Sequence, residues 1–171
     1  MMSDADRLSG LPPVIGPGTR LIVLGSFPGV ASLVAGQYYA HPRNHFWPLL
    51  ASLWGVDLPA LPYDDRLTVL RARGLGLWDV YAACRREGSL DSAIRDAALN
   101  DLASLRQRAP GLRGVAHNGG ESARARRHTE ALDLPVWRLP STSPANASWS
   151  FDRKRAAWRA VFLEAGLDVN D

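Results

Sequence analysis

The stretch Leu21-Ile22-Val23-Leu24-Gly25-Ser26-Phe27-Pro28-Gly29 joins a continuous apolar run to a turn rich in Gly and Pro. An apolar run of this length, bounded by Gly, is typical of a strand buried on both faces of a parallel sheet. The turn is predicted to be a tight connection that leaves backbone N–H groups pointing outward. Open α/β sheets bind ligands in the loops that follow their strands. We therefore take as candidate ligand-binding residues Gly25, Ser26, Phe27, Pro28 and Gly29.

Aromatic, amide and imidazole side chains gather shortly afterwards, in Tyr38-Tyr39-Ala40-His41-Pro42-Arg43-Asn44-His45-Phe46-Trp47. A helical spacing of apolar residues continues from there to Trp54 and stops at Gly55. Asn44 stands where the N-cap of that helix is expected. A bare turn that faces such a cluster is typical of a pocket for a flat, polar ring.

Four short apolar runs lie far apart along the chain, separated by patterns typical of helices. The runs span residues 20–25, 76–81, 114–118 and 135–140. The helical patterns cover residues 44–54, begin near Asp91, near Asn100 and after Gly120, and end with a helix capped by Ser150. This alternation predicts an α/β fold with three α/β/α layers around a central four-stranded parallel sheet. We expect one domain over residues 1–171, with an irregular lead-in over residues 1–19.

The composition is that of an ordinary globular protein, with 46% hydrophobic and 22% charged residues in 171. No leader or long apolar segment is visible, so we expect the cytoplasm and no membrane. The single Cys84 excludes an internal disulfide, a Cys-rich zinc site and an iron–sulfur cluster. The absence of a Gly-x-Gly-x-x-Gly turn and of a phosphate-loop lysine disfavours dinucleotide-binding enzymes and NTPases.

The net charge is +3, and it comes almost entirely from arginine because Lys154 is the sole lysine. This excess suits a polyanionic partner. Equally, it fits a GC-rich genome that favours arginine codons. The histidines show no spacing typical of metal ligands, so no metal or other cofactor is expected.

Polar residues lie near the end of each of the four predicted strands, or just after it. They are residues 38–44 after the first strand, Asp79 in the second, Asn118-Gly119-Gly120 after the third, and residues 139–146 after the fourth. Parallel strands end at the same edge of a sheet, so these four loops are expected to converge there.

Two of these segments together resemble the uracil-DNA glycosylase superfamily. Residues 39–47, Tyr-Ala-His-Pro-Arg-Asn-His-Phe-Trp, are similar to the segment after the first motif of the mismatch-specific uracil and thymine glycosylases. Residues 25–29 occupy the place of the first motif, and Leu139-Pro140-Ser141-Thr142-Ser143 that of the second. The resemblance covers roughly residues 19–165. It implies the uracil-DNA glycosylase-like fold and a DNA glycosylase that acts in base excision repair.

One departure from the mismatch-specific enzymes changes the implied chemistry. Those enzymes carry a catalytic Asn in the first motif, where this chain has Phe27. The chain is most similar to the hypoxanthine-DNA glycosylase (DNA-deoxyinosine glycosylase) branch, in which the essential amide lies in the later segment. That amide maps onto Asn44, which would orient the attacking water. From spacing alone, however, the helix N-cap is the better interpretation of Asn44.

The resemblance also implies how the base would be bound. Backbone N–H groups around Ser26 and Phe27 would contact it, and Tyr39 would stack on it, unless Tyr39 is a core residue. Asp79 would read the base edge, accepting the N1–H of hypoxanthine as a carboxylate or donating when protonated. The alternative for Asp79 is a carboxylate that caps a turn. His41 would donate to the leaving base or to a phosphate, or else is structural.

Other residues are candidates for contacts with the DNA backbone. Ser141, Thr142 and Ser143 are small donors suited to phosphates. Asn118-Gly119-Gly120 opens a helix whose N-terminus can bind phosphate, or is simply a turn. Relatives insert a wedge from residues 144–146, which are small here. Arg124, Arg126 and Arg127 either follow the DNA backbone or form an ordinary solvated face.

We therefore expect a monomeric, monofunctional DNA glycosylase that flips a deaminated base, most simply hypoxanthine, out of double-stranded DNA and leaves an abasic site. Lys154 is predicted to lie on the final helix, away from the pocket, so no Schiff base is expected. The enzyme would act on the nucleoid of a bacterial-type cell. Two alternatives stay open: a uracil or thymine mismatch glycosylase of the same fold, and an inactive module that only binds damaged DNA.

Overall fold

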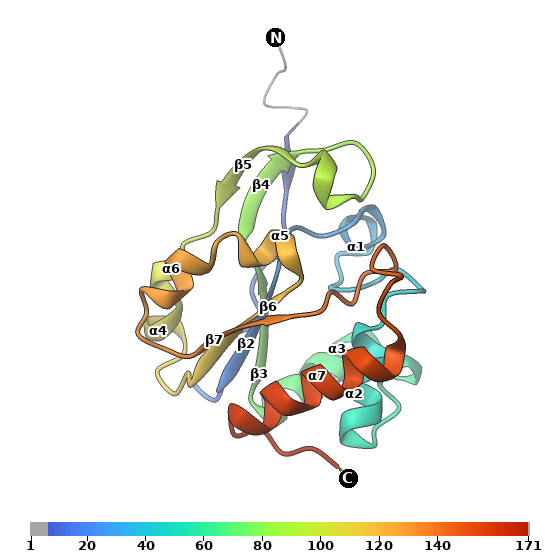
Figure 1. The fold of residues 1–171 in the computed structure, drawn as a ribbon, viewed down its shortest axis with the longest axis vertical. Coiled ribbons are helices and arrows are strands. Elements are labelled where there is room, and N and C mark those ends of the chain that lie inside the picture. The colour runs from blue at the N-terminus through green and yellow to red at the C-terminus, as the bar shows by residue number, and fades with distance from the viewer. Residues whose placement is uncertain (1–6, 171) are drawn as a thin grey trace.

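A four-stranded parallel sheet forms the centre of the computed structural model, which describes residues 7–170 (Figure 1). Its strands are β2 (Leu21–Gly25), β3 (Leu75–Asp79), β6 (Gly114–Asn118) and β7 (Val136–Leu139), in the spatial order β3-β2-β6-β7. All three strand pairs are parallel. The four strands are those predicted from the apolar runs, and the α/β fold with a central parallel sheet is confirmed.

The sheet is buried on both faces because its apolar side chains alternate between two cores. In β2, Leu21 and Val23 pack into one core, whereas Ile22 and Leu24 pack into the other. All four side chains are at most 1% exposed. This burial on both sides is the reason that the strand is a continuous apolar run with no polar alternation.

Three longer helices cover the face that Leu21 and Val23 reach (Figure 1). They are α2 (Phe46–Trp54), α3 (Tyr63–Arg73) and α7 (Phe151–Glu164). The expected N-cap of α7 is confirmed, since the Ser150 hydroxyl accepts the backbone N–H of Arg153 at 3.2 Å. The indole of Trp158 ties α7 to the loop after β7 by donating to the carbonyl of Pro140.

Short helices cover the opposite face. They are α4 (Leu105–Arg108), α5 (Gly120–Ala123) and α6 (Arg126–Glu130), with single 3₁₀ turns at Leu102–Ser104 and, elsewhere, at Leu58–Ala60. The helix expected after Gly120 is thus two short helices. The helix expected near Asn100 is a 3₁₀ turn followed by α4. Another short helix, α1 (Val30–Ala35), follows the first turn and was not predicted.

A second sheet lies beyond the carboxyl edge of the first and was missed by the sequence analysis. It pairs β1 (Leu8–Ser9) with β4 (Tyr81–Arg85) and β4 with β5 (Arg95–Leu99), all antiparallel. The helix expected near Asp91 is wrong: only one 3₁₀ turn, Asp91–Ala93, forms before the chain enters β5. Pairing with β4 outweighs the weak helical pattern there.

The expectation of an irregular lead-in is also wrong for part of residues 7–19, and residues 1–6 lie outside the described residues. Besides β1, Val14 pairs antiparallel with Leu77 in β3. The two residues exchange both backbone hydrogen bonds, at 2.8 and 2.9 Å. Val14 is 6% exposed and belongs to the larger core, so this segment extends the sheet past its edge strand.

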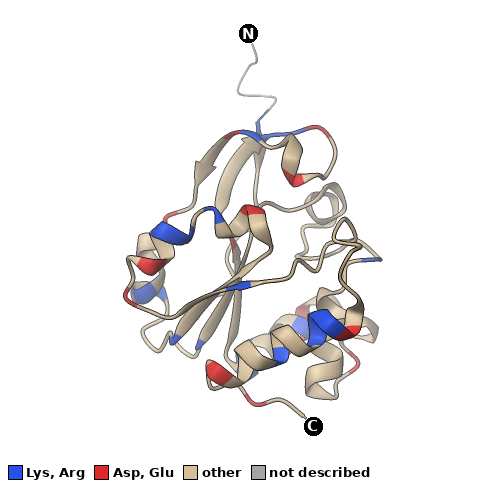
Figure 2. Ribbon diagram, viewed as in Figure 1, with Lys and Arg blue, Asp and Glu red and all other residues tan. Residues whose placement is uncertain are grey.

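Charged residues lie mostly on the helices and outer loops. Figure 2 shows basic residues along α7 and a mixture of acidic and basic residues around α6. Within residues 7–170, no helix has the length and apolar character needed to cross a membrane.

Replacing Ser150 by Ala should lower the free energy of unfolding by about 1 kcal/mol, because α7 loses the side-chain acceptor for its first turn. Urea denaturation with the linear extrapolation measures the change. Ser148→Ala is the matched control: that hydroxyl is exposed and contacts only the side chain of Asn146, at 3.4 Å. Equal stability of the two variants would contradict a capping role for Ser150.

Candidate active site

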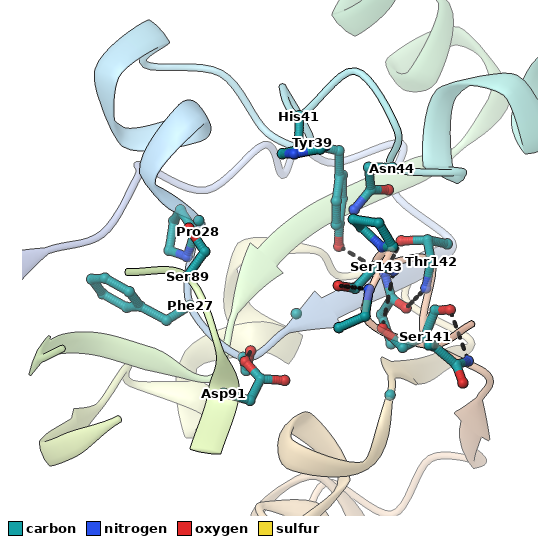
Figure 3. A pocket seen from close by; sticks show the side chains of 18 of the residues that line it. Phe27, Pro28, Tyr39, His41, Asn44, Ser89, Asp91, Ser141, Thr142 and Ser143 are labelled. Carbon is teal, nitrogen blue, oxygen red and sulfur yellow. Dashed lines mark hydrogen bonds between the residues drawn. The ribbon is translucent and has the colours of Figure 1, made fainter. Parts of the chain in front are cut away.

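A cavity of about 740 Å³ opens at the carboxyl edge of the parallel sheet. Segments that follow β2, β6 and β7 line it, together with Asp79 at the end of β3 and residues 89–92 from the loop between β4 and β5 (Figure 3). The convergence expected from the sequence is therefore present. Every candidate ligand-binding and catalytic residue lines this one cavity: Gly25, Ser26, Phe27, Pro28, Gly29, Tyr39, His41, Asn44, Asp79, Asn118, Ser141, Thr142 and Ser143.

The turn after β2 presents backbone rather than side chains to the cavity. The backbone N–H groups of Ser26 and Phe27 have no acceptor among residues 7–170. The Phe27 ring is buried and lies on the side of the turn away from Tyr39 and Asn44 (Figure 3). A side chain at Gly25 would put its Cβ 2.5 Å from the Oδ1 atom of Asp79, so Gly keeps the approach to that carboxyl open. Two N–H donors are thus available to a bound ring.

Tyr39 forms one wall of the cavity. Its ring stacks on Phe46 with a centroid separation of 4.1 Å and an interplanar angle of 26°. Its hydroxyl accepts the side-chain N–H of Asn118 at 3.2 Å. The backbone of Tyr39 has φ +56°, an uncommon conformation for a bulky residue and one that tends to occur at functional sites. The ring is therefore held in place and lines the cavity, as a stacking platform requires.

Asn44 is held in a defined orientation at the start of α2. Its Oδ1 accepts the backbone N–H of Phe46 at 2.9 Å, and this contact assigns Nδ2 to the other end of the amide. No residue in the described part of the chain accepts from Nδ2, and the amide extends into the pocket (Figure 3). The N-cap is His45, so the expected cap position was wrong by one residue. Asn44 nevertheless satisfies an orphan donor of the helix and presents an N–H to the cavity.

Asp79 is the buried acid of the cavity, at 4% exposure. Burial, and to a smaller extent the charge of Asp91, raise its pKa to about 7, against the opposing effect of Arg86. Its Oδ2 is buried without a hydrogen-bond partner in residues 7–170. Oδ1 lies beside Gly25. A carboxylate would be costly with one oxygen unsatisfied, so the environment favours the neutral acid up to about pH 7.

The Asn118 carboxamide joins three parts of the site. Its Nδ2 donates to the hydroxyls of Tyr39 and Thr142, and its Oδ1 accepts the backbone N–H of Thr142 at 3.1 Å. The carbonyl of Thr142 in turn accepts the backbone N–H of His45 at 2.9 Å. Thr142 is 1% exposed, so the expected phosphate contact does not fit this residue. Asn118 and Thr142 position the walls of the cavity.

The remaining polar residues lie at the rim. Ser141 and Ser143 are partly exposed, and each hydroxyl accepts a backbone N–H two residues on, which leaves its own hydrogen free to donate. The Nδ1 atom of His41 accepts the backbone N–H of Arg43 at 3.1 Å, so the proton of the neutral ring lies on Nε2. Ser141, Ser143 and His41 can therefore all donate, as phosphate contacts require.

Lys154 lies closer to the site than expected. Its ammonium does not line the cavity, but Nζ is 3.2 Å from the Nδ1 atom of His45, the neighbour of Asn44. Burial lowers the pKa of Lys154. Burial and the nearby charge of Lys154 also lower the pKa of His45, which keeps that imidazole neutral and able to accept from the ammonium. Lys154 thus braces the segment that carries Asn44.

Residues 89–92 and Arg138 are among the cavity residues that the sequence analysis missed. Residues 89–92 belong to the unpredicted loop between β4 and β5, and their only signal is a polar cluster, Ser-Leu-Asp-Ser. Arg138 is exposed and lines the cavity, and its guanidinium lies over Gly120. The one indication of Arg138 in the sequence was that a charged residue interrupts the apolar run over residues 135–140.

The basic helix surface considered from the sequence is largely engaged in local contacts. Arg124 pairs with Glu121 at 3.3 Å, and Arg126 pairs with Glu130 at 2.6 Å. In each pair the two partners are about one helical turn apart, which is the pattern of a solvated helix face. The turn at Gly119 leads into α5, which has only four residues. These features give no particular support to DNA contacts on this side.

Comparison with known proteins agrees with this geometry. The family described as the Uracil DNA glycosylase superfamily matches residues 12–163. A hypoxanthine DNA glycosylase of Methanosarcina barkeri is 39% identical over 156 residues, covering 91% of this chain and 98% of that protein. One of the same name from Methanosarcina acetivorans is 37% identical over 153 residues, covering 90% and 96%.

A solution NMR structure from Methanosarcina acetivorans, of a candidate uracil DNA glycosylase, superposes with a TM-score of 0.84. It is 35% identical and covers 93% of this chain and 98% of its own. The fold, the cavity at the strand ends and the match over most of the sequence lead to one conclusion. The chain belongs to the uracil DNA glycosylase superfamily.

Proposed function

We propose that the protein is a DNA glycosylase that removes hypoxanthine from DNA and leaves an abasic site. The observation that carries this proposal is the cavity itself: an aromatic wall at Tyr39, free backbone N–H groups after β2, a buried acid at Asp79 and an oriented amide at Asn44. The two relatives of 37–39% identity that are named hypoxanthine DNA glycosylase support the choice of base.

Asp79 would recognise the lactam edge of the base as a neutral acid. Its Oδ1, which faces the space above Gly25, would accept the N1–H of hypoxanthine. Negative charge develops on the departing base, and an ionised carboxylate in contact with it would oppose that charge by roughly 4 kcal/mol at an effective dielectric constant near 20. The neutral acid avoids this repulsion. It also resembles the Asn that related enzymes place at this position.

The glycosidic bond would break before water attacks. The N–H groups of Ser26 and Phe27 would stabilise charge on the base, where donors lower the barrier most. The Nδ2–H of Asn44 would hold the oxygen of the attacking water. An amide is a poor base, so this arrangement suits a sugar that has already become strongly electrophilic.

The enzyme would be monofunctional. A Schiff base needs an amine in contact with the sugar. Lys154, the sole lysine, is 1% exposed, does not line the cavity and is bound to His45. Donors at the rim, on the partly exposed Ser141, Ser143 and His41 and the exposed Arg138, would hold the phosphates of double-stranded DNA around the flipped nucleotide.

A panel of oligonucleotides tests the substrate directly. Purified protein should release hypoxanthine from duplexes that contain deoxyinosine faster than it acts on matched duplexes with deoxyuridine or a G·T mispair. Cleavage at the lesion should appear only after the DNA is heated in alkali. Preference for uracil or thymine would favour the mismatch-specific alternative, and intact DNA throughout would favour a binding module without activity.

Replacing Asn44 by Ala should reduce single-turnover excision by two to three orders of magnitude, about the loss seen when one oriented donor is removed from an active site. Affinity for inosine-containing DNA should change little, because the water contact contributes after binding. Asn170→Ala is the control: that amide donates to the carbonyl of Trp54, outside the cavity. Unchanged excision by the Asn44 variant would refute its catalytic role.

Excision should fall as the pH rises through the pKa of Asp79, which is about 7. Below this pH the group is neutral and the leaving base meets no like charge, whereas above it the carboxylate opposes departure. Single-turnover rates should be measured between about pH 6 and about pH 8. The logarithm of the rate should decline with pH, and its slope should approach −1 per pH unit above the pKa. Asp79→Asn should remove the decline. A rate that rises with pH would instead show that the carboxylate form reads the base.

A further inference from the structure

Large apolar side chains are seldom exposed in residues 7–170, and two of the exceptions lie at the rim of the cavity. Those with the greatest exposure are Val30 at 47%, Val34 at 83%, Leu90 at 59%, Leu99 at 43% and Leu163 at 47%. Of these, Val30 and Leu90 line the cavity. Leu90 is the longer of the two and lies in the loop between β4 and β5.

The loop that carries Leu90 is fixed on both sides of it. The hydroxyl of Ser89 accepts the backbone N–H of Val30 at 2.9 Å. The carboxyl of Asp91 accepts the hydroxyl of Ser26 at 2.6 Å. Leu90, at 59% exposure, therefore lies between two residues, Ser89 and Asp91, that are bound to the turn after β2 and to the residue that follows it. Figure 3 shows Ser89 and Asp91 beside that turn. Single exposed apolar side chains are common on protein surfaces, so it is the position of Leu90, on a fixed loop at the rim of the cavity, that matters.

Arg86 adds a second support to the same loop. Its Nε donates to the carbonyl of Gly88 and its Nη2 to the carbonyl of Pro28, both at 2.7 Å. The guanidinium also lies over the Phe27 ring, 5.3 Å from its centroid. The loop and the turn after β2 thus form one braced unit on one side of the cavity.

The opposite rim offers no side chain of comparable use. Residues Pro144, Ala145 and Asn146 are small, and Asn146 is engaged with the carbonyl of Ser141. Trp149 is large, but its ring is stacked on the guanidinium of Arg153 at 4.0 Å. A nucleotide that leaves the duplex for the cavity vacates a space between stacked bases, and apolar wedges such as Leu fill spaces of this kind.

We propose that Leu90 enters the base stack and fills the space left by the everted nucleotide. The proposal rests on the glycosylase function and adds the element that opens the duplex. The braced loop supplies the rigidity that a wedge needs, because a mobile side chain would be ordered at additional entropic cost. The wedge matters only where a stack exists, so its contribution is confined to duplex substrates.

Leu90→Ala should slow single-turnover excision of hypoxanthine from duplex DNA by about tenfold or more, since duplex opening loses its apolar partner. Excision from the single strand of the same sequence should stay within about twofold, because no stack must be opened. Val34→Ala removes a more exposed apolar side chain away from the cavity and should change neither rate. Thermal unfolding confirms that all variants fold.

Two further measurements separate this proposal from the glycosylase function. Leu90→Ala should bind a duplex with a stable abasic-site analogue about tenfold more weakly than the wild type, with unchanged affinity for the single-stranded analogue, and this readout needs no chemistry. Equal losses on duplex and single strand would make Leu90 a pocket residue and overturn the proposal. A duplex-specific loss in Trp149→Ala instead would assign the wedge to Trp149 and also overturn it. Failure of the wild type to release hypoxanthine would refute the function alone.

Discussion

The carboxamide of Asn118 is the contact on which the geometry of the site depends. It stands at the end of strand β6 and holds both Tyr39 and Thr142. The carbonyl of Thr142 accepts the backbone N–H of His45 and so also holds the start of α2, where Asn44 lies. An amide can do this because it donates and accepts at once. One side chain on the rigid sheet therefore fixes two loops relative to each other: the connection between α1 and α2, and the loop after β7.

The charges of the site are arranged so that few of them face the cavity. Asp79 is held neutral by burial up to about pH 7, and Asn44 cannot ionise. The ammonium of Lys154 is directed to the neutral ring of His45. The groups proposed to contact the leaving base therefore present dipoles and N–H donors in place of formal charges. Such an environment lowers the barrier to bond breaking, and the attack of water on the resulting sugar does not require a strong base.

The central sheet could be predicted because its strands are apolar on both faces, and their carboxyl ends then had to meet. The second sheet could not, because β5 reads Arg-Asp-Ala-Ala-Leu and is mostly exposed. Its strand conformation comes from pairing with β4, a tertiary effect that the β-propensities of the five residues do not reveal. The same limit hid residues 89–92, which reach the cavity only because that hairpin forms. Asn44 was found by resemblance, since its spacing alone indicates only a helix start.

The change to Phe27 and the position of the β4–β5 loop are physically linked. A short amide at residue 27 would leave the guanidinium of Arg86 without the ring that it now covers. That guanidinium holds the carbonyls of Pro28 and Gly88 together, and so joins the first turn to the loop that presents Leu90. With the catalytic amide supplied by Asn44, as proposed above, residue 27 would be free to become part of this brace. On these two proposals, the wall of the cavity around Phe27 would pack against the loop that presents Leu90 to the duplex. The wall around Asn44 would carry the chemistry.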